Sequence, residues 1–225
     1  GMNVEGAKLW PDLFDIVKAR VKPERDGLRA DNSSARALKN NWWRFQAHRP
    51  DLYDSLKGLD RCLVAARVSK HLMFSMQPVD RVFSEQLYVF PFNSYSSFAI
   101  LQSRIHEFWA WLFSSTMRDA GIRYSAGDCF DKFPFPDKDI RMVIPTIELV
   151  GGELYKCRAK YMQNTDKGLT TTYNEMKDPG CDNICILELR RLHEAMDQAV
   201  LTAYGWTDIE IPPYCPINKE ETAAV

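Results

Sequence analysis

The chain has 225 residues, of which 45% are apolar, and a formal net charge of −1. This length and composition suit one large domain or two small ones with buried cores, and they argue against a disordered chain. No apolar run reaches the roughly 18 residues of a membrane-spanning helix. The N-terminus lacks the basic and apolar regions of a signal peptide. We therefore expect a cytoplasmic protein with no membrane partner.

The six cysteines form no CxxC pair, and no histidine pair stands near the closest two, Cys181 and Cys185. A zinc site needs clustered ligands of these kinds. The cysteines are therefore expected to be reduced, mostly buried thiols, and no metal site is predicted.

Positive charge is concentrated in one part of the chain. Residues 18–70 contain thirteen Lys or Arg and six Asp or Glu, whereas the rest contains sixteen basic and twenty-four acidic residues. This asymmetry favours a face that binds a polyanion. A solvated basic surface without a partner explains the charge alone equally well.

The first predicted element is a helix over residues 8–22, with Pro11 in its first turn, an apolar stripe along one side and Pro23 at its end. The polar segment 24–41 is expected to be a loop with a short helical piece. The apolar runs of a strand-rich region follow. These runs are "RCLVAARV" (61–68), "HLMFSMQ" (71–77) and "LYVFPF" (87–92).

A long helix is predicted from Ser96 or Ser97, either of which could be its N-cap, to about Met117. Its apolar stripe consists of Phe98, Leu101, Ile105, Phe108 and Leu112. Further helices are expected over 146–164, where Gly151 and Gly152 weaken the pattern, and over 183–204 before Gly205. The segment 166–180 is expected to be a loop with a short helix, and the tail 206–225 to be loose.

The stretch "DCFDKFPFPD" (128–137) places three phenylalanines and two prolines within seven residues. Because proline fixes φ and removes a backbone donor, this stretch suits a stiff connector with buried rings. We therefore predict an α+β fold: a mixed strand and helix domain over 1–137, followed by a mainly helical segment over 138–225.

No catalytic constellation is evident in the sequence. It lacks a GxGxxG loop, a GxSxG nucleophile motif and a histidine pair at metal spacing. His106 and His193 fit packing or surface positions. "IPPY" (211–214) resembles the Asn/Asp-Pro-Pro-Tyr/Phe loop of amino-methylases, but Ile211 cannot accept a hydrogen bond from an amino group. The chain alone is predicted to be non-catalytic and to bind no cofactor.

Basic residues interleave with aromatic ones in "WWRFQAHRP" (42–50) and "ARVSKHLMF" (66–74). Arg, Lys and Ser bind phosphates, and Arg and Lys also read guanine edges. The structural alternative is core tryptophans with cations around them, which suits Trp42 and Trp43 better. The candidate DNA-binding residues are Arg44, Arg49, Arg67, Ser69, Lys70, His71 and Arg123.

Eight segments in this order resemble the C-terminal part of MmeI-like, type IIG restriction–modification enzymes, which are DNA adenine-N6 methyltransferases. The resemblance covers roughly residues 12–207, and its segments include "WWRF" (42–45), "ARVSKH" (66–71), "FAILQSRIHEFWA" (98–110), "RYSAGDCFDKFPFP" (123–136) and "GLTTTYNEMKDP" (168–179). The resemblance implies a target recognition domain for double-stranded DNA, followed by a helical segment. It also implies that S-adenosylmethionine binds a methylase core that this sequence lacks.

Two alternatives remain. The chain could be an interaction subunit that docks on a separate methylase chain through the helix 183–204, without touching DNA. It could also be a stand-alone enzyme, although no acid–base pair, nucleophile or metal set supports that interpretation.

Overall fold

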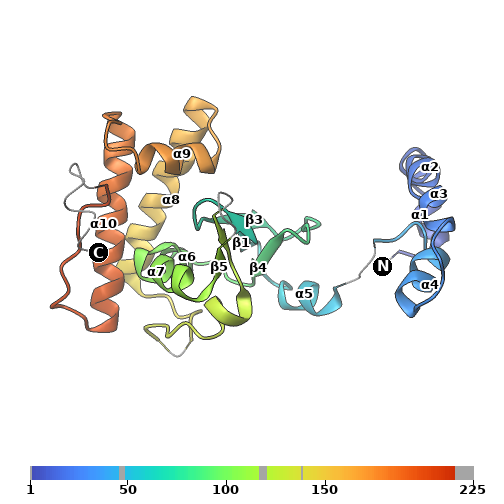
Figure 1. The fold of residues 1–225 in the computed structure, drawn as a ribbon, viewed down its shortest axis with the longest axis horizontal. Helices are drawn as coiled ribbons and strands as arrows, with labels where there is room; N and C mark the ends of the chain where they lie inside the picture. Colours follow the sequence, from blue (N-terminus) through green and yellow to red (C-terminus); the bar gives the residue numbers. More distant parts are fainter. Residues whose placement is uncertain (1, 46–48, 117–120, 138, 216–225) are drawn as a thin grey trace. The chain divides into compact units, whose positions relative to one another are not determined.

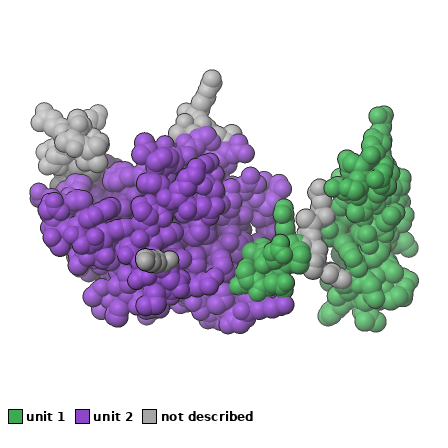
Figure 2. Space-filling view, turned by 90° about the horizontal axis from the view of Figure 1, so that it is seen from below, with its two compact units in different colours: residues 1–55 green, residues 56–225 purple. Residues whose placement is uncertain are grey.

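The chain divides into two compact units, unit 1 of residues 1–55 and unit 2 of residues 56–225 (Figure 2). The computed structural model describes residues 2–45, 49–116, 121–137 and 139–215 (Figure 1). The predicted boundary at residue 137 lies inside unit 2. Phe133 and Ile147, on either side of that boundary, belong to one continuous apolar core.

Unit 1 is built from short helices. The described ones are α1 (Val4–Lys8), α2 (Pro11–Arg20), α3 (Lys22–Asp26), α4 (Ser33–Asn40) and α5 (Pro50–Ser55). The single helix expected over 8–22 is divided: Lys8 ends α1, and most of the range forms α2, which begins at Pro11. Pro11 occupies the first turn of α2, as predicted. The segment 24–41 is more helical than expected, since the Asn32 side chain caps α4.

The apolar side chains of unit 1 are largely accessible, and no residue described in this unit is buried. Leu13 and Ile16, from the predicted apolar stripe, are 61% and 52% exposed. Phe14 does pack on Trp42, with 5.3 Å between the ring centroids. The described residues of unit 1 therefore show ring packing at the surface, and none of them forms a buried core.

Unit 2 contains an antiparallel sheet in the order β3-β1-β4. Its strands are β1 (Arg61–Ala66), β3 (Phe74–Pro78) and β4 (Leu87–Phe90), and each overlaps a predicted strand. Leu63 and Ala65 alternate along β1 and are buried on one face, as is Phe74, which pairs with Ala65. This face forms the floor of the core.

A second small antiparallel sheet has the order β2-β6-β5. Its strands are β2 (Val68–Ser69), β6 (Ile122–Arg123) and β5 (Ser115–Thr116). The register pairs Val68 with Arg123 and Ser69 with Ile122. Ile122 is 1% exposed, so one face of this sheet also contributes to the core.

The long helix expected from residue 96 to 117 is two helices, α6 (Tyr95–Gln102) and α7 (Arg104–Phe113). Ser103 separates them with an extended backbone, at ψ 153°. Its hydroxyl donates to the Ile100 carbonyl at 2.8 Å and accepts from the His106 amide at 3.4 Å. A serine that bonds to neighbouring backbone groups competes with helix continuation, which accounts for the break.

This break changes which residues of α7 face the core. Phe108 and Leu112, from the predicted stripe, are 55% and 75% exposed, whereas His106 and Ala110 are buried. The N-cap of α6 is also two residues earlier than the earliest one predicted, because Ser94 accepts from the Ser97 amide at 3.0 Å.

The C-terminal part of unit 2 is helical, with α8 (Pro145–Thr165), α9 (Leu169–Met176) and α10 (Ile184–Tyr204). α8 packs against both α6 and α10 (Figure 1). The predicted helix over 183–204 is confirmed, and Gly205 ends it in the left-handed region at φ 74°. Leu189, Met196 and Val200 of α10 are fully buried.

The stretch 128–137 begins inside a π-helix, η2 (Ala126–Phe130), and then runs through the two prolines. Phe133 is 5% exposed and contacts Phe135, with ring centroids 4.9 Å apart. Phe130 and Phe135 are half-buried and pack on the core. The predicted burial is complete for Phe133 and partial for the other two rings.

The tail is ordered over its described part, up to residue 215, contrary to the expectation of a loose segment. The Tyr214 amide donates to Glu194 at 2.7 Å, and its ring packs on His193 with 4.7 Å between centroids. "IPPY" therefore ends in a packing residue. None of the helices described is long and apolar enough to cross a membrane.

Candidate nucleic-acid interface

Five of the seven predicted DNA-binding residues are close together in unit 2. They lie directly before β2, on β2, on the bend that follows it and on β6. Because β2 pairs antiparallel with β6, the segment from Arg67 to His71 runs beside Arg123. Val68 and Arg123 are directly opposite and both are exposed, so this pair lies on the outer face of the sheet.

Arg67 is half-buried and held in place by its neighbours. Its guanidinium donates to the Glu85 carbonyl at 3.3 Å and lies over the Tyr88 ring, 5.7 Å from the centroid. Its backbone amide also donates to the Gln86 carbonyl. These contacts fix the side chain at the rim of the sheet while leaving further guanidinium donors for a ligand.

Ser69 has mainly a local structural role. Its hydroxyl donates to the His71 carbonyl at 2.6 Å and lies 3.4 Å from the His71 amide. This pair of contacts closes the bend between β2 and β3, in the interval between the predicted apolar runs 61–68 and 71–77.

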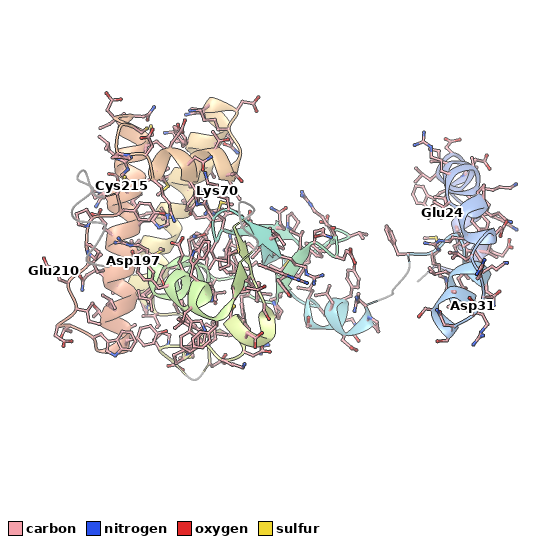
Figure 3. All side chains as sticks on the ribbon, viewed as in Figure 1. Glu24, Asp31, Lys70, Asp197, Glu210 and Cys215 are labelled. Carbon is pink, nitrogen blue, oxygen red and sulfur yellow. The ribbon has the colours of Figure 1, made fainter. Side chains whose placement is uncertain are left out.

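Lys70 and His71 both contact Asn174 on α9. The Lys70 ammonium donates to Asn174 Oδ1 at 2.8 Å, and His71 Nε2 lies 2.9 Å from the same oxygen. Lys70, labelled in Figure 3, is exposed, whereas His71 is 6% exposed. Lys70 is therefore accessible to a ligand, and His71 lies beneath it.

Burial lowers the pKa of His71 and outweighs the opposite effect of the hydrogen bond with Asn174. The charges of Lys177 and Lys70 lower this pKa further, and Glu107 raises it. His71 is thus neutral at pH 7, and the positive charge at this site comes from its lysine and arginine neighbours.

Arg123 depends on a close approach between two backbone segments. Gly121 precedes β6 with φ 90°, and a Cβ there would lie 2.4 Å from the Ser69 carbonyl oxygen. Any larger residue would push β6 away from β2, and Arg123 with it. Gly121, two residues before the "RYSAGDCFDKFPFP" segment, was not among the residues predicted from the sequence.

Arg44 and Arg49 belong to unit 1. Arg44 Nε donates to the Met2 carbonyl at 2.9 Å, and the guanidinium lies 5.5 Å from the Trp43 centroid. Arg44 is therefore at least partly a structural residue, whereas the side chain of Arg49 is exposed.

A buried network supports the bend from below, and the sequence analysis missed it. Gln102 accepts from the Phe74 amide at 2.9 Å and donates to the Leu72 carbonyl at 3.0 Å. Arg158, which is 2% exposed, donates to the Phe74 carbonyl at 2.7 Å and to the Tyr173 hydroxyl at 3.0 Å. Helices α6, α8 and α9 thus hold the start of β3.

The candidate site presents cationic and hydrogen-bonding side chains, which are the kinds that contact phosphates and base edges. Across the described ranges, no group of three or more His, Cys, Asp or Glu could hold a metal ion. Asp197, the carboxylate that burial affects most, pairs with Arg104 at 2.5 Å as a link between α7 and α10 (Figure 3).

Comparison with known proteins gives a family and a fold. The sequence model of the MmeI target recognition domain matches residues 14–137. A solved structure of the type IIL restriction–modification enzyme MmeI in complex with DNA is similar, with a TM-score of 0.61 and 20% identity. The similarity covers 94% of this chain and 26% of that enzyme, so this chain spans about a quarter of its length. No curated protein matches.

Proposed function

Because this chain belongs to the MmeI target recognition domain family, we propose that it binds double-stranded DNA as the recognition module of an adenine-N6 methyltransferase. The observation that carries this proposal is the pairing of β2 with β6, which places Arg123 opposite Val68 and beside the segment that carries Arg67 and Lys70. Of these, Lys70 and Arg123 are exposed. Exposed cations on or beside a sheet can fix the register of a protein on the phosphate backbone.

The mechanism needs recognition energy as well as chemistry. A base-modifying enzyme extrudes its target base at a cost of about a few kcal/mol. Phosphate and groove contacts made by a recognition module offset this cost. In this proposal, Lys70 and Arg123 contact phosphates, and Arg67 is oriented toward the groove by the Tyr88 ring.

The test is a titration of the chain with labelled duplex DNA over a range of salt concentrations. We expect the logarithm of the affinity to fall linearly with the logarithm of salt concentration. Lys70→Glu and Arg123→Glu should each weaken binding, and each should make the salt slope shallower by about one. Arg141→Glu, which changes an exposed arginine outside the site, is the matched control.

Absence of binding at low salt, even with a methylase partner added, would refute the proposal. Equal effects of Arg141→Glu and Arg123→Glu would instead place the interface elsewhere on the molecule.

S-adenosylmethionine and the methyl transfer belong, in this proposal, to a methylase core outside the given sequence. We expect no transfer from labelled S-adenosylmethionine to DNA by this chain alone. Transfer should appear, or increase, when a methylase core that uses this module is added. Transfer by the isolated chain would show that a catalytic site is present in it.

The alternative role as an interaction subunit is distinguished by the same charge reversals. Docking through α10 would use the exposed side chains near its start, since Leu189, Met196 and Val200 are committed to the core. Ile184 and Leu187 are 76% and 41% exposed. Under this alternative, Ile184→Glu would abolish capture of a methylase chain, whereas Lys70→Glu would leave it unchanged.

A further inference from the structure

Asn174 lies on α9, outside the residues 14–137 that match the recognition domain family. Its Oδ1 atom is the common partner of two consecutive residues of the candidate interface, Lys70 and His71. The contacts join segments about a hundred residues apart in the sequence. One amide oxygen thus ties the C-terminal helices to the bend that follows β2.

The contact with His71 defines the state of its imidazole. An amide oxygen accepts hydrogen bonds and donates none, so His71 Nε2 must carry the proton. The ring lies beside Tyr173, with 6.1 Å between centroids, and Ser69 bonds to both backbone groups of His71. Position, tautomer and backbone of His71 are therefore fixed together.

The contact with Lys70 leaves that residue able to bind a ligand. A lysine ammonium has three donors, and Asn174 takes one of them. Lys70 itself is exposed. A long lysine side chain loses rotamer entropy when it binds a phosphate, and a residue that already holds the ammonium reduces that loss.

We propose that Asn174 is a positioning residue of the DNA site, which holds the Lys70 ammonium toward the phosphate backbone while it anchors the His71 ring beneath. The recognition surface then includes α9 and is not confined to the matched domain. His71 acts as an internal support and not as a direct DNA contact. This inference rests on the proposed DNA-binding function.

Three charged groups near His71 influence its pKa, and a test of its protonation must account for them. They are Lys70 on its own segment, Lys177 after α9, and Glu107 on α7. Lys177 and Glu107 are paired at 2.7 Å. Replacing Asn174 by Asp would keep an acceptor for both donors but add a negative charge. Replacing it by Ala removes the acceptor without changing the charge, and is the cleaner variant.

The experiment combines NMR of the His71 ring with DNA titrations of Lys70→Ala, Asn174→Ala and the double variant. Asn164→Ala, an exposed asparagine on α8, is the control, and thermal melting confirms that each variant folds. We expect Asn174→Ala to shift the His71 ring nitrogens away from the Nε2–H tautomer and to weaken DNA binding about threefold, the order of the rotamer entropy of one immobilised side chain. The double variant should bind no more weakly than Lys70→Ala alone.

Additive losses in the double variant, or unchanged DNA affinity in Asn174→Ala, would overturn the inference while leaving DNA binding by the chain established. If the wild-type chain does not bind DNA at low salt, the proposed function fails and the DNA role of Asn174 fails with it. The NMR signature then still reports whether Asn174 anchors His71. An unchanged His71 spectrum in Asn174→Ala would overturn that contact independently.

Discussion

The imidazole of His106 has a hydrogen bond on each nitrogen, deep in unit 2. Nδ1 donates to the Leu101 carbonyl at 2.7 Å, and Nε2 accepts from the Tyr124 hydroxyl at 3.1 Å. The Leu101 carbonyl can only accept, so the proton is on Nδ1, and in the neutral ring Nε2 is the acceptor for the Tyr124 hydroxyl. Burial lowers the pKa of His106 to about 4. This residue links α7 to the strand that carries Arg123.

Acid should therefore destabilise the fold partly through His106. The unfolded state binds a proton near pH 6.5 and the folded state near pH 4, so the stabilisation is complete above pH 6.5 and is lost as pH falls toward 4. Over that range the loss is about 3 kcal/mol for this one group. His106→Gln should be less stable at pH 7 but show a shallower decline. The measurement is the free energy of unfolding by urea from pH 7.5 to 4.

Other buried titratable groups also contribute to the pH dependence of the free energy of unfolding. His71 and His193 have lowered pKa values and act in the same direction as His106. Burial raises the pKa of Asp197 to about 6, so its ionisation opposes folding as pH rises from 3.8 to 6. An identical pH slope in wild type and His106→Gln would contradict the assignment.

The sequence predicted well the residues that act locally on the backbone, but it did not predict which side chains contact residues distant in the sequence. Pro11 and Gly205 occupy the helix positions that their backbone preferences indicate. Asn174 and Gly121 act through Lys70, His71 and Ser69, which are distant in sequence, and no local pattern encodes such a pairing.

At the scale of the elements, the crossing of α6 and α8 depends on Gly151. The sequence analysis took Gly151 and Gly152 as weaknesses of a helix, since glycine costs about 1 kcal/mol in a helix interior relative to alanine. In the structure, a Cβ on Gly151 would lie 2.6 Å from the Tyr95 carbonyl oxygen and 2.9 Å from the Ala99 Cβ. The lost propensity is the cost of close contact between the two helices.

Gly151→Ala should thus destabilise the protein despite its better helix propensity. Overpacking against a backbone atom costs about 1–3 kcal/mol, which exceeds the gain in propensity. Gly152→Ala is the matched control, because its Cβ would meet the Tyr95 ring at 3.2 Å, where a side chain can move. Urea unfolding of both variants tests this, and a Gly151→Ala variant at least as stable as Gly152→Ala would exclude a tight crossing.

Apolar periodicity located most elements but not their interruptions. The pattern over 96–117 is continuous through Ser103, so one helix was predicted where two exist. The break is produced by hydroxyl bonds to the backbone, which carry no hydrophobic signal. The break also affects the candidate interface, because it determines which residues of α7 face the segment of β6. His106 is one of them and contacts Tyr124.

At the scale of the molecule, the two units differ in how they are stabilised. The buried apolar residues begin at Leu56 and lie in unit 2, whereas unit 1 shows none among its described residues. The predicted domain boundary at residue 137 followed a change in composition, but packing crosses that point. Composition describes the residue types of a local segment, whereas a boundary between compact units depends on long-range contacts that are not visible in the sequence.

This division predicts that residues 56–225 fold as an isolated fragment and bind duplex DNA. The fragment keeps the continuous core and three of the proposed contacts, Arg67, Lys70 and Arg123. It should unfold in a single cooperative transition, because one core holds its sheets and helices together. Its salt slope should be shallower than that of the full chain by about one for each phosphate contact that Arg44 and Arg49 make. A folded fragment without DNA binding, beside a full chain that binds, would move the interface to unit 1.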